Sequence, residues 1–237
     1  MSCSGLLCAA VGTIGPPGQS QGFALTYSGG SWSKPKSLGS GSTYAVSCAS
    51  DAFCIAVSDT GDAYTLRGVT WSPATDIYPP ANSQPSATDA VDDVSCADPG
   101  FCVAVTAEGK ALTWNGNTWS TPQAAVPGIQ PPLFPGDFGY VAVSFATSTY
   151  CLAGTGISAF QAPSATRNGS QWSATPQGPV EAADWHVSCA TATFCMAAGR
   201  LPCRRRRFLR LERVELVRAG QPGQPGPGTG IQSGLLP

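Results

Sequence analysis

A Ser-Cys motif recurs at nearly constant intervals along this 237-residue chain. Its five copies begin at Ser2, Ser47, Ser95, Ser144 and Ser188. The intervals between them are 45, 48, 49 and 44 residues, and only the fourth copy has phenylalanine in place of cysteine. Self-similarity with a period of roughly 20–50 residues indicates a repeat protein, in which each repeat is one supersecondary unit.

Each repeat contains the same succession of short segments. In the second repeat, Ser47-Cys48 is followed by a second cysteine, Cys54, which opens the small-apolar segment C-I-A-V-S. A turn centred on Gly61 leads to the alternating segment A-Y-T-L, and a G-x-x-W-S turn ends at Trp71 and Ser72. Four short strands in about 45 residues is the size of one propeller blade. The sequence therefore predicts an all-β, propeller-like array of four-stranded repeats.

Composition and repeat number support this architecture over its alternatives. Only 11% of residues are charged, while Gly 28 and Pro 21 favour many short strands joined by turns. A trefoil would need three units and a sandwich would not repeat its sequence. We expect units at about 1–46, 47–93, 94–142 and 143–187, with a partial unit at 188–199. These amount to about four and a half blades, so we expect an incomplete propeller.

The cysteines are expected to form a disulfide within each hairpin. Cysteines facing one another on paired strands approach to a Cα separation of about 4.5 Å, close to disulfide geometry. We predict the pairs Cys3–Cys8, Cys48–Cys54, Cys96–Cys102 and Cys189–Cys195. Cys151 lacks a partner and is expected to be a small buried hydrophobe. A zinc site is not expected, because the chain has one histidine and no C-x-x-C pair.

The tryptophans of the G-x-x-W turns have two interpretations. Each would open the last strand of its blade and wedge against the next blade, as part of the core between blades. The alternative is a platform on which sugars stack. The four residues are Trp32, Trp71, Trp119 and Trp172.

The Arg/Pro/Gly-rich tail, residues 200–237, departs from the rest of the chain. Residues 1–199 carry a net charge of −7, whereas the tail carries +6. Taken literally, the tail resembles a basic amphipathic helix of the kind that binds membranes or nucleic acid. Read one base later with GC-rich codons, however, Leu211 to Pro222 can encode W-N-G-S-S-W-S-A-P, close to W-N-G-N-T-W-S-T-P at 114–122. We therefore interpret the tail as frameshifted, and either disordered or spuriously helical, and expect no nucleic-acid partner.

The compartment follows from the repeated cysteine pairs. Disulfides persist in oxidising surroundings, so we expect an extracellular, secreted protein. The start M-S-C-S-G-L-L-C has no basic region and is no ordinary signal peptide, and other repeats read V-S-C there. We expect the true start to lie upstream. No apolar run approaches the length of about 18 residues needed for a membrane span.

Catalytic motifs are not found, and we expect no catalytic residues, cofactor or metal ion. In propellers, ligands bind where the loops between blades converge. The residues before each inner strand are therefore the candidate ligand face, for a sugar or a peptide: Tyr44, Asp92, Asp93, Tyr140, Trp185 and His186.

The repeat resembles those of secreted, actinobacterial-type proteins that read S-C-x-S-x-x-F-C-x-A-V…G-x-x-W-S, over residues 1–199. It is also distantly similar to sialidase-like Asp-box propellers. The Asp-box S-x-D-x-G-x-x-W is not met, since Ser58-Asp59-Thr60-Gly61 has another order and no nearby tryptophan. Sialidase activity is therefore not implied.

Three functions remain open from the sequence. The first is a non-catalytic extracellular binding or scaffold propeller, with a glycan or a protein as partner. The second is a secreted carbohydrate-active enzyme or its carbohydrate-binding accessory domain. The third is a non-functional fragment of a disrupted repeat gene.

Overall fold

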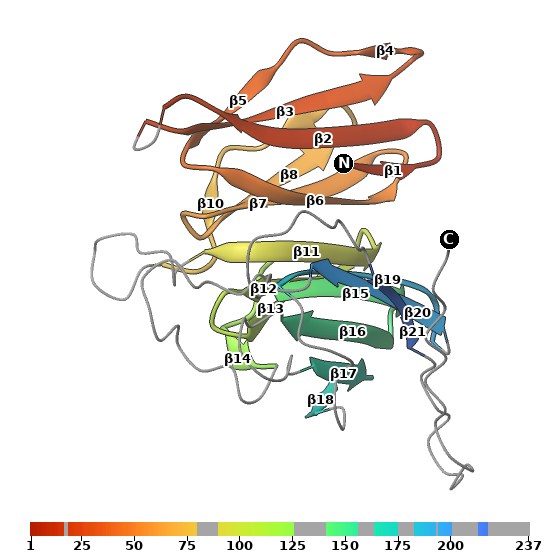
Figure 1. Cartoon of the computed structure of the whole chain (residues 1–237). Coiled ribbons are helices and arrows are strands. Elements are labelled where there is room, and N and C mark those ends of the chain that lie inside the picture. Colours follow the sequence, from red (N-terminus) through yellow and green to blue (C-terminus); the bar gives the residue numbers. More distant parts are fainter. Residues whose placement is uncertain are drawn as a thin grey trace, which may run out of the picture.

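The computed structural model describes residues 1–16, 19–79, 90–125, 141–155, 164–174, 183–192, 194–200 and 213–217. All regular elements in these ranges are strands, arranged in five antiparallel sheets that follow one another along the chain (Figure 1). We call these sheets the first to fifth blades. The fold is that of a β-propeller, as the repeat predicted.

The blades share one order of strands, from the inside outwards. The first contains β1 (Ser2–Ser4), β2 (Leu7–Ile14), β3 (Gln21–Ser28), β4 (Ser31–Trp32) and β5 (Lys36–Ser40). The second contains β6 (Thr43–Ser50), β7 (Phe53–Ser58), β8 (Asp62–Arg67), β9 (Thr70–Trp71) and β10 (Thr75–Asp76). The third contains β11 (Val91–Asp98), β12 (Phe101–Thr106), β13 (Lys110–Trp114) and β14 (Gln123–Ala124).

The fourth blade contains β15 (Val141–Thr147), β16 (Tyr150–Thr155), β17 (Ser164–Asn168) and β18 (Gln171–Ala174), and the fifth contains β19 (Ala183–Thr191), β20 (Phe194–Arg200) and β21 (Arg213–Val217). In the first two blades the outermost position is shared by two short strands, because β4 and β5 both pair with β3, and β9 and β10 both pair with β8.

The two innermost strands of each blade form a hairpin whose register places the cysteines opposite one another. Cys48 faces Cys54 across β6 and β7, and the same pairing recurs in the first, third and fifth blades. The structure joins all four predicted pairs, with Cα–Cα separations of 3.9–4.0 Å. In the fourth blade Phe145 faces Cys151, which is free and buried, as expected.

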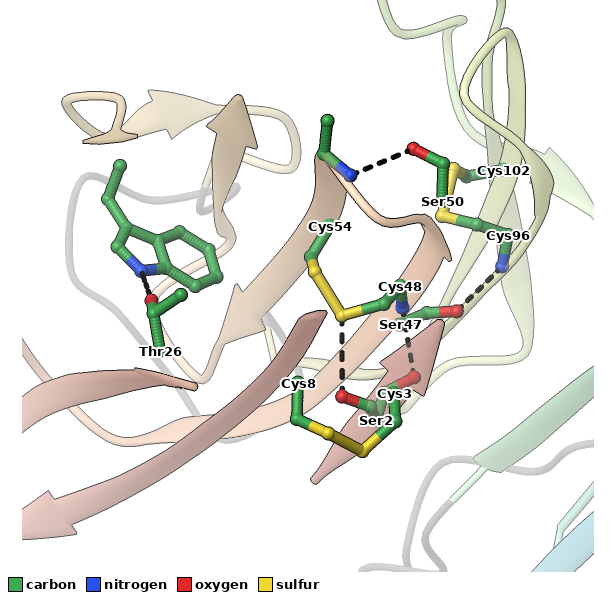
Figure 2. Close-up of a disulfide and its surroundings, with 12 residues drawn as sticks. Ser2, Cys3, Cys8, Thr26, Ser47, Cys48, Ser50, Cys54, Cys96 and Cys102 are labelled. Carbon is green, nitrogen blue, oxygen red and sulfur yellow. Dashed lines mark hydrogen bonds between the residues drawn. A yellow bond between two sulfur atoms is a disulfide. The ribbon is translucent and has the colours of Figure 1, made fainter. Parts of the chain in front are cut away.

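The inner strands are linked by a ladder of side-chain hydrogen bonds, which we call the serine ladder. Four of the five motif serines accept a hydrogen bond from a backbone N–H of the next blade, and Figure 2 shows two of these bonds. The four bonds measure 2.9–3.0 Å. They run from Cys48 to Ser2, from Cys96 to Ser47, from Phe145 to Ser95 and from Cys189 to Ser144.

The core lies between the faces of neighbouring blades. Three described clusters fill the spaces between the first and second, second and third, and third and fourth blades. Small residues of the second strands belong to these clusters, and Ala9, Ala56, Ala104 and Ala153 are fully buried. A single blade this thin cannot bury both its faces, so each blade depends on its neighbours.

The tryptophan of the second blade joins this core. Trp71 is buried, and its Nε1–H donates to Thr26 Oγ1 of the first blade at 3.2 Å (Figure 2). Trp119 and Trp172 pack against the clusters between the blades, whereas Trp32 is 47% exposed. The core interpretation is thus confirmed for Trp71, but Trp71 contacts the preceding blade where the sequence predicted the next one. Trp32 lies outside the three described clusters.

Two local expectations are corrected. Arg213–Val217 forms strand β21, paired with β20, where the sequence predicted disorder or a helix. The rest of the tail lies outside the described residues. His186, interpreted as a loop residue, lies within β19 opposite Ala198, because the inner strand begins earlier than the V-S-C motif suggested. Among the described residues no helix is long and apolar enough to cross a membrane.

Candidate functional site

The blades place different chemistry at their two ends. One end carries the disulfide hairpins and the turns before the G-x-x-W tryptophans. The opposite end carries the first residues of the inner strands and the turns that follow β7 and β12. We call it the acidic end and define it by its charged residues. These are the acidic Asp59, Asp62, Asp76, Asp92, Asp93 and Glu108 and the basic Lys110.

The turn after β7 fixes the chain segment that enters the second blade. The backbone N–H of Ser42 donates to Asp59 Oδ1 at 2.7 Å, and the N–H of Asp59 donates back to the Ser42 carbonyl at 3.0 Å. Gly41 has φ +92°, and a Cβ there would lie 2.4 Å from Asp59 Oδ1. The residue next to Asp59 must therefore be glycine, both for conformation and for space.

A shallow polar depression lies beside this contact, between the first two blades. It is lined by Gln19, Ser20, Gln21, Ser40, Gly41 and Asp59. Gln21 and Ser40 stand at strand ends of the first blade, and the Gly41 N–H donates to the Ser20 carbonyl at 2.9 Å. Together with the Ser42–Asp59 contact, they hold part of the wall of the depression. Tyr44, 42% exposed near the start of β6, lies at the same end of the blade.

A second polar group joins the second and third blades at this end. Tyr78 donates its hydroxyl proton to Glu108 Oε2 at 2.8 Å, and Lys110 Nζ donates to the Tyr78 oxygen at 2.8 Å. Lys110 also pairs with Glu108 at 2.6 Å. Burial raises the pKa of Tyr78, and hydrogen bonding to Glu108 raises that of Lys110. At neutral pH Tyr78 therefore remains a neutral hydroxyl and Lys110 a cation.

Asp92 and Asp93 contact the next blade. Asp92 Oδ2 accepts from the backbone N–H of Val141 at 3.1 Å, and Asp93 Oδ2 accepts from that of Val143 at 2.9 Å. Burial raises the pKa of Asp92 to about 7 and that of Asp93 to about 6, although the hydrogen bonds act in the opposite direction. Both carboxyl groups extend the bonding of the serine ladder along β15.

The other residues of the predicted ligand face differ in how the structure places them. Tyr44 and His186 are exposed near the starts of β6 and β19, while Trp185 is placed only by its backbone in β19. Tyr140 lies outside the described residues. Sequence reasoning overlooked the residues after the second strands, such as Asp59 and Glu108. The sequence does contain a signal for these residues, because a polar turn with a central glycine follows the second strand in the second and third blades.

The chemistry available at the acidic end is non-covalent. The Asp59 carboxylate and the polar side chains of Gln19, Gln21 and Ser40 line the depression, and groups of this kind bind cationic and hydrogen-bonding partners. Within the described ranges, His, Cys, Asp and Glu do not form a group of three suited to holding a metal ion.

Comparisons with known proteins support the architecture. No protein-family model matches the sequence, and no curated protein matches it. Among solved structures, the chain is similar to U3-55K, with a TM-score of 0.55 and 12% identity over 85% of this chain and 65% of that one. It is also similar to the Pan2 WD40 domain of Neurospora crassa, with a TM-score of 0.50 and 9% identity over 87% and 60% of the two chains. The chain thus spans less than two thirds of either structure, and the likeness is one of fold.

Proposed function

We propose that this chain is a non-catalytic binding or scaffold propeller that works in an oxidising, extracellular compartment. Four disulfides in the innermost hairpins support the compartment, since such bonds persist outside the reducing cytosol. The partner is a protein segment rich in lysine or arginine, bound at the acidic end. The net charge of −7 over residues 1–199 attracts such a segment and speeds its association.

The observation that carries the proposal is the depression at Asp59. The Ser42–Asp59 contact fixes its backbone on the side of the second blade, which lowers the cost of ordering that side when a ligand binds. Asp62 and Asp76 face one another across β8 and β10 at the same end. Burial and the negative charge of Asp62 raise the pKa of Asp76. A cationic partner bound between the two carboxylates would offset their mutual repulsion.

The proposal is tested by calorimetry with a lysine- and arginine-rich peptide pool against a glutamate-rich pool of equal length. We expect binding of the basic pool only, weakening as salt increases. The double variant Asp59→Asn/Asp76→Asn should weaken that binding about fivefold, because two exposed charge contacts of modest energy are lost. The asparagine introduced in place of Asp59 still accepts from Ser42, so the fold is preserved.

The matched control is Asp51→Asn/Asp98→Asn, which removes the same charge at the hairpin end. The asparagine introduced in place of Asp98 still accepts from the Gly100 N–H, as the native carboxylate does at 2.8 Å. Equal loss in both double variants would mean that only net charge acts, and equal binding of both peptide pools would contradict the proposal. A glycan array run in parallel tests the carbohydrate-binding alternative, and glycan binding without peptide binding would favour it.

A further inference from the structure

The two oxygens of the Asp59 carboxylate differ in what they contact. Oδ1 accepts a hydrogen bond from the backbone N–H of Ser42 at 2.7 Å, whereas within the described ranges Oδ2 has no hydrogen-bond partner. The side chain is half-buried and lines the polar depression between the first two blades. The fold therefore holds one oxygen in place and leaves the other for a ligand.

The surroundings of Asp59 in the depression are polar but uncharged. Gln19, Gln21 and Ser40 are exposed and supply amide and hydroxyl groups, and the described residues of the lining include no lysine or arginine. The depression has a volume of about 400 Å³, near the lower end of the range of about 300–1,000 Å³ for ligand pockets. It therefore suits one cationic side chain that also donates hydrogen bonds.

The contact with Ser42 distinguishes between the two basic side chains of a partner. An arginine guanidinium pairs most strongly by donating two parallel hydrogen bonds to both oxygens of a carboxylate. At Asp59 one of these bonds competes with the Ser42 N–H for Oδ1. A lysine ammonium is a compact charge with three rotatable donors. It bonds to Oδ2 alone and directs its other donors to the neutral acceptors around it.

We propose that the depression is a lysine-selective subsite, in which the ammonium group of one partner lysine binds Asp59 Oδ2. The inference rests on the proposed function and selects lysine among the basic residues of the partner segment. Asp62 and Asp76, at the same end of the second blade, attract lysine and arginine alike through their charge. Selectivity therefore resides in the hydrogen-bond geometry at Asp59, and attraction in the acidic end as a whole.

The test compares N-acetylated peptides of one length and one net charge by calorimetry. Their basic residues are lysine, arginine or trimethyllysine, and N-acetylation removes the α-ammonium group as a source of binding. The lysine peptide should bind about fivefold more tightly than the arginine peptide, because arginine loses one hydrogen bond to the carboxylate. The trimethyllysine peptide keeps the charge but has no N–H donor, and should also bind about fivefold more weakly than the lysine peptide.

Two variants locate the selectivity. In Asp59→Asn, the amide oxygen still accepts from the Ser42 N–H, while an amide donor replaces Oδ2. The difference between the lysine and arginine peptides should therefore disappear. Asp76→Asn is the matched control, because it removes one charge at the same end without touching the depression. It should weaken the binding of both peptides and keep their affinity ratio.

The outcomes separate the subsite from the proposed function. Equal binding of the lysine and arginine peptides, tighter binding of the arginine peptide, or undiminished binding of the trimethyllysine peptide would overturn the lysine subsite and leave the proposed function standing. A lysine preference that persists in Asp59→Asn would overturn the assignment to Asp59. If no basic peptide binds more tightly than a glutamate peptide of the same length, the proposed function fails, and the subsite with it.

Discussion

The backbone N–H of Phe145 donates to Ser95 Oγ at 3.0 Å, in the one repeat where phenylalanine replaces the first cysteine. The equivalent bonds in the other blades measure 2.9 Å. The serine ladder therefore does not depend on the disulfide beside it. The two residues of the motif have separate roles, since the serine joins neighbouring blades and the cysteine closes the hairpin within one blade.

Removing one hydroxyl of the ladder should destabilise the protein. Ser47→Ala leaves the Cys96 N–H without its acceptor between two blades. We expect a loss of about 1 kcal/mol in the free energy of unfolding, measured by urea denaturation. Ser47→Thr keeps an acceptor and should lose less. Ser31→Ala, on exposed β4, should be neutral, and an equal loss there would contradict the role of Ser47.

The buried tryptophan between the first two blades should matter more than its exposed equivalent. Trp71→Phe removes the Nε1–H donor to Thr26 Oγ1 and leaves a small cavity. We expect a loss of about 1–3 kcal/mol in unfolding free energy. Trp32→Phe should change stability by less than about 0.5 kcal/mol, because Trp32 is largely exposed. Equal destabilisation of Trp71→Phe and Trp32→Phe would contradict the buried role of Trp71.

Stability should fall as pH rises through the range where Asp92 and Asp93 ionise. Their folded pKa values, about 7 and about 6, exceed the ordinary value of 3.8. The folded state therefore binds protons more tightly than the unfolded chain. This contribution is complete below about pH 4 and is lost as pH rises through the folded pKa values of about 6 and about 7.

Asp92→Asn tests this pH dependence directly. Asparagine still accepts from the Val141 N–H, but carries no charge to bury. The melting temperature of the variant should match that of the parent near pH 4 and exceed it at pH 8. Asp51→Asn, at an exposed turn, is the control, and its melting temperature should follow that of the parent at every pH. If Asp92→Asn differs from the parent by the same amount at every pH, the raised pKa of Asp92 is contradicted.

A single disulfide should contribute only modestly. The Cys48–Cys54 bond closes a loop with a sequence separation of 6, so it restricts the unfolded chain less than a long loop would. Replacing both cysteines with alanine should lower the free energy of unfolding by about 2 kcal/mol. Chemical denaturation under non-reducing conditions measures this value. Loss of the fold on removing this one pair would show that the hairpin, rather than the packing between blades, determines stability.

The free cysteine should be unreactive while the protein is folded. Cys151 is fully buried, and burial raises the pKa of its thiol to about 12, so little thiolate exists at neutral pH. In a Cys203→Ser background, a thiol reagent such as iodoacetamide should label Cys151 only on unfolding. Rapid labelling of the native protein would indicate that the fourth blade opens readily.

The repeat made the fold and the cysteine pairing predictable. The spacing of the repeats identifies the blades, because four short strands in each repeat, with a cysteine pair in the first hairpin, fit few other folds. The role of Ser47 was not predictable, because its partner Cys96 lies 49 residues away on a different blade. The sequence likewise placed Asp92 and Asp93 at a ligand face and did not predict their hydrogen bonds to Val141 and Val143. Those contacts depend on how neighbouring blades pack, which the sequence does not reveal.

Hydrogen exchange of individual amides tests the serine ladder, and with it the packing of the Ser-Cys blades, most directly. By NMR, the amide protons of Cys48, Cys96, Phe145 and Cys189 should exchange slowly, since each donates to a motif serine. In Ser47→Ala, the Cys96 amide alone among these four should exchange markedly faster. Unchanged protection of Cys96 in that variant, or rapid exchange of all four amides in the parent, would contradict the packing of Ser-Cys blades described above.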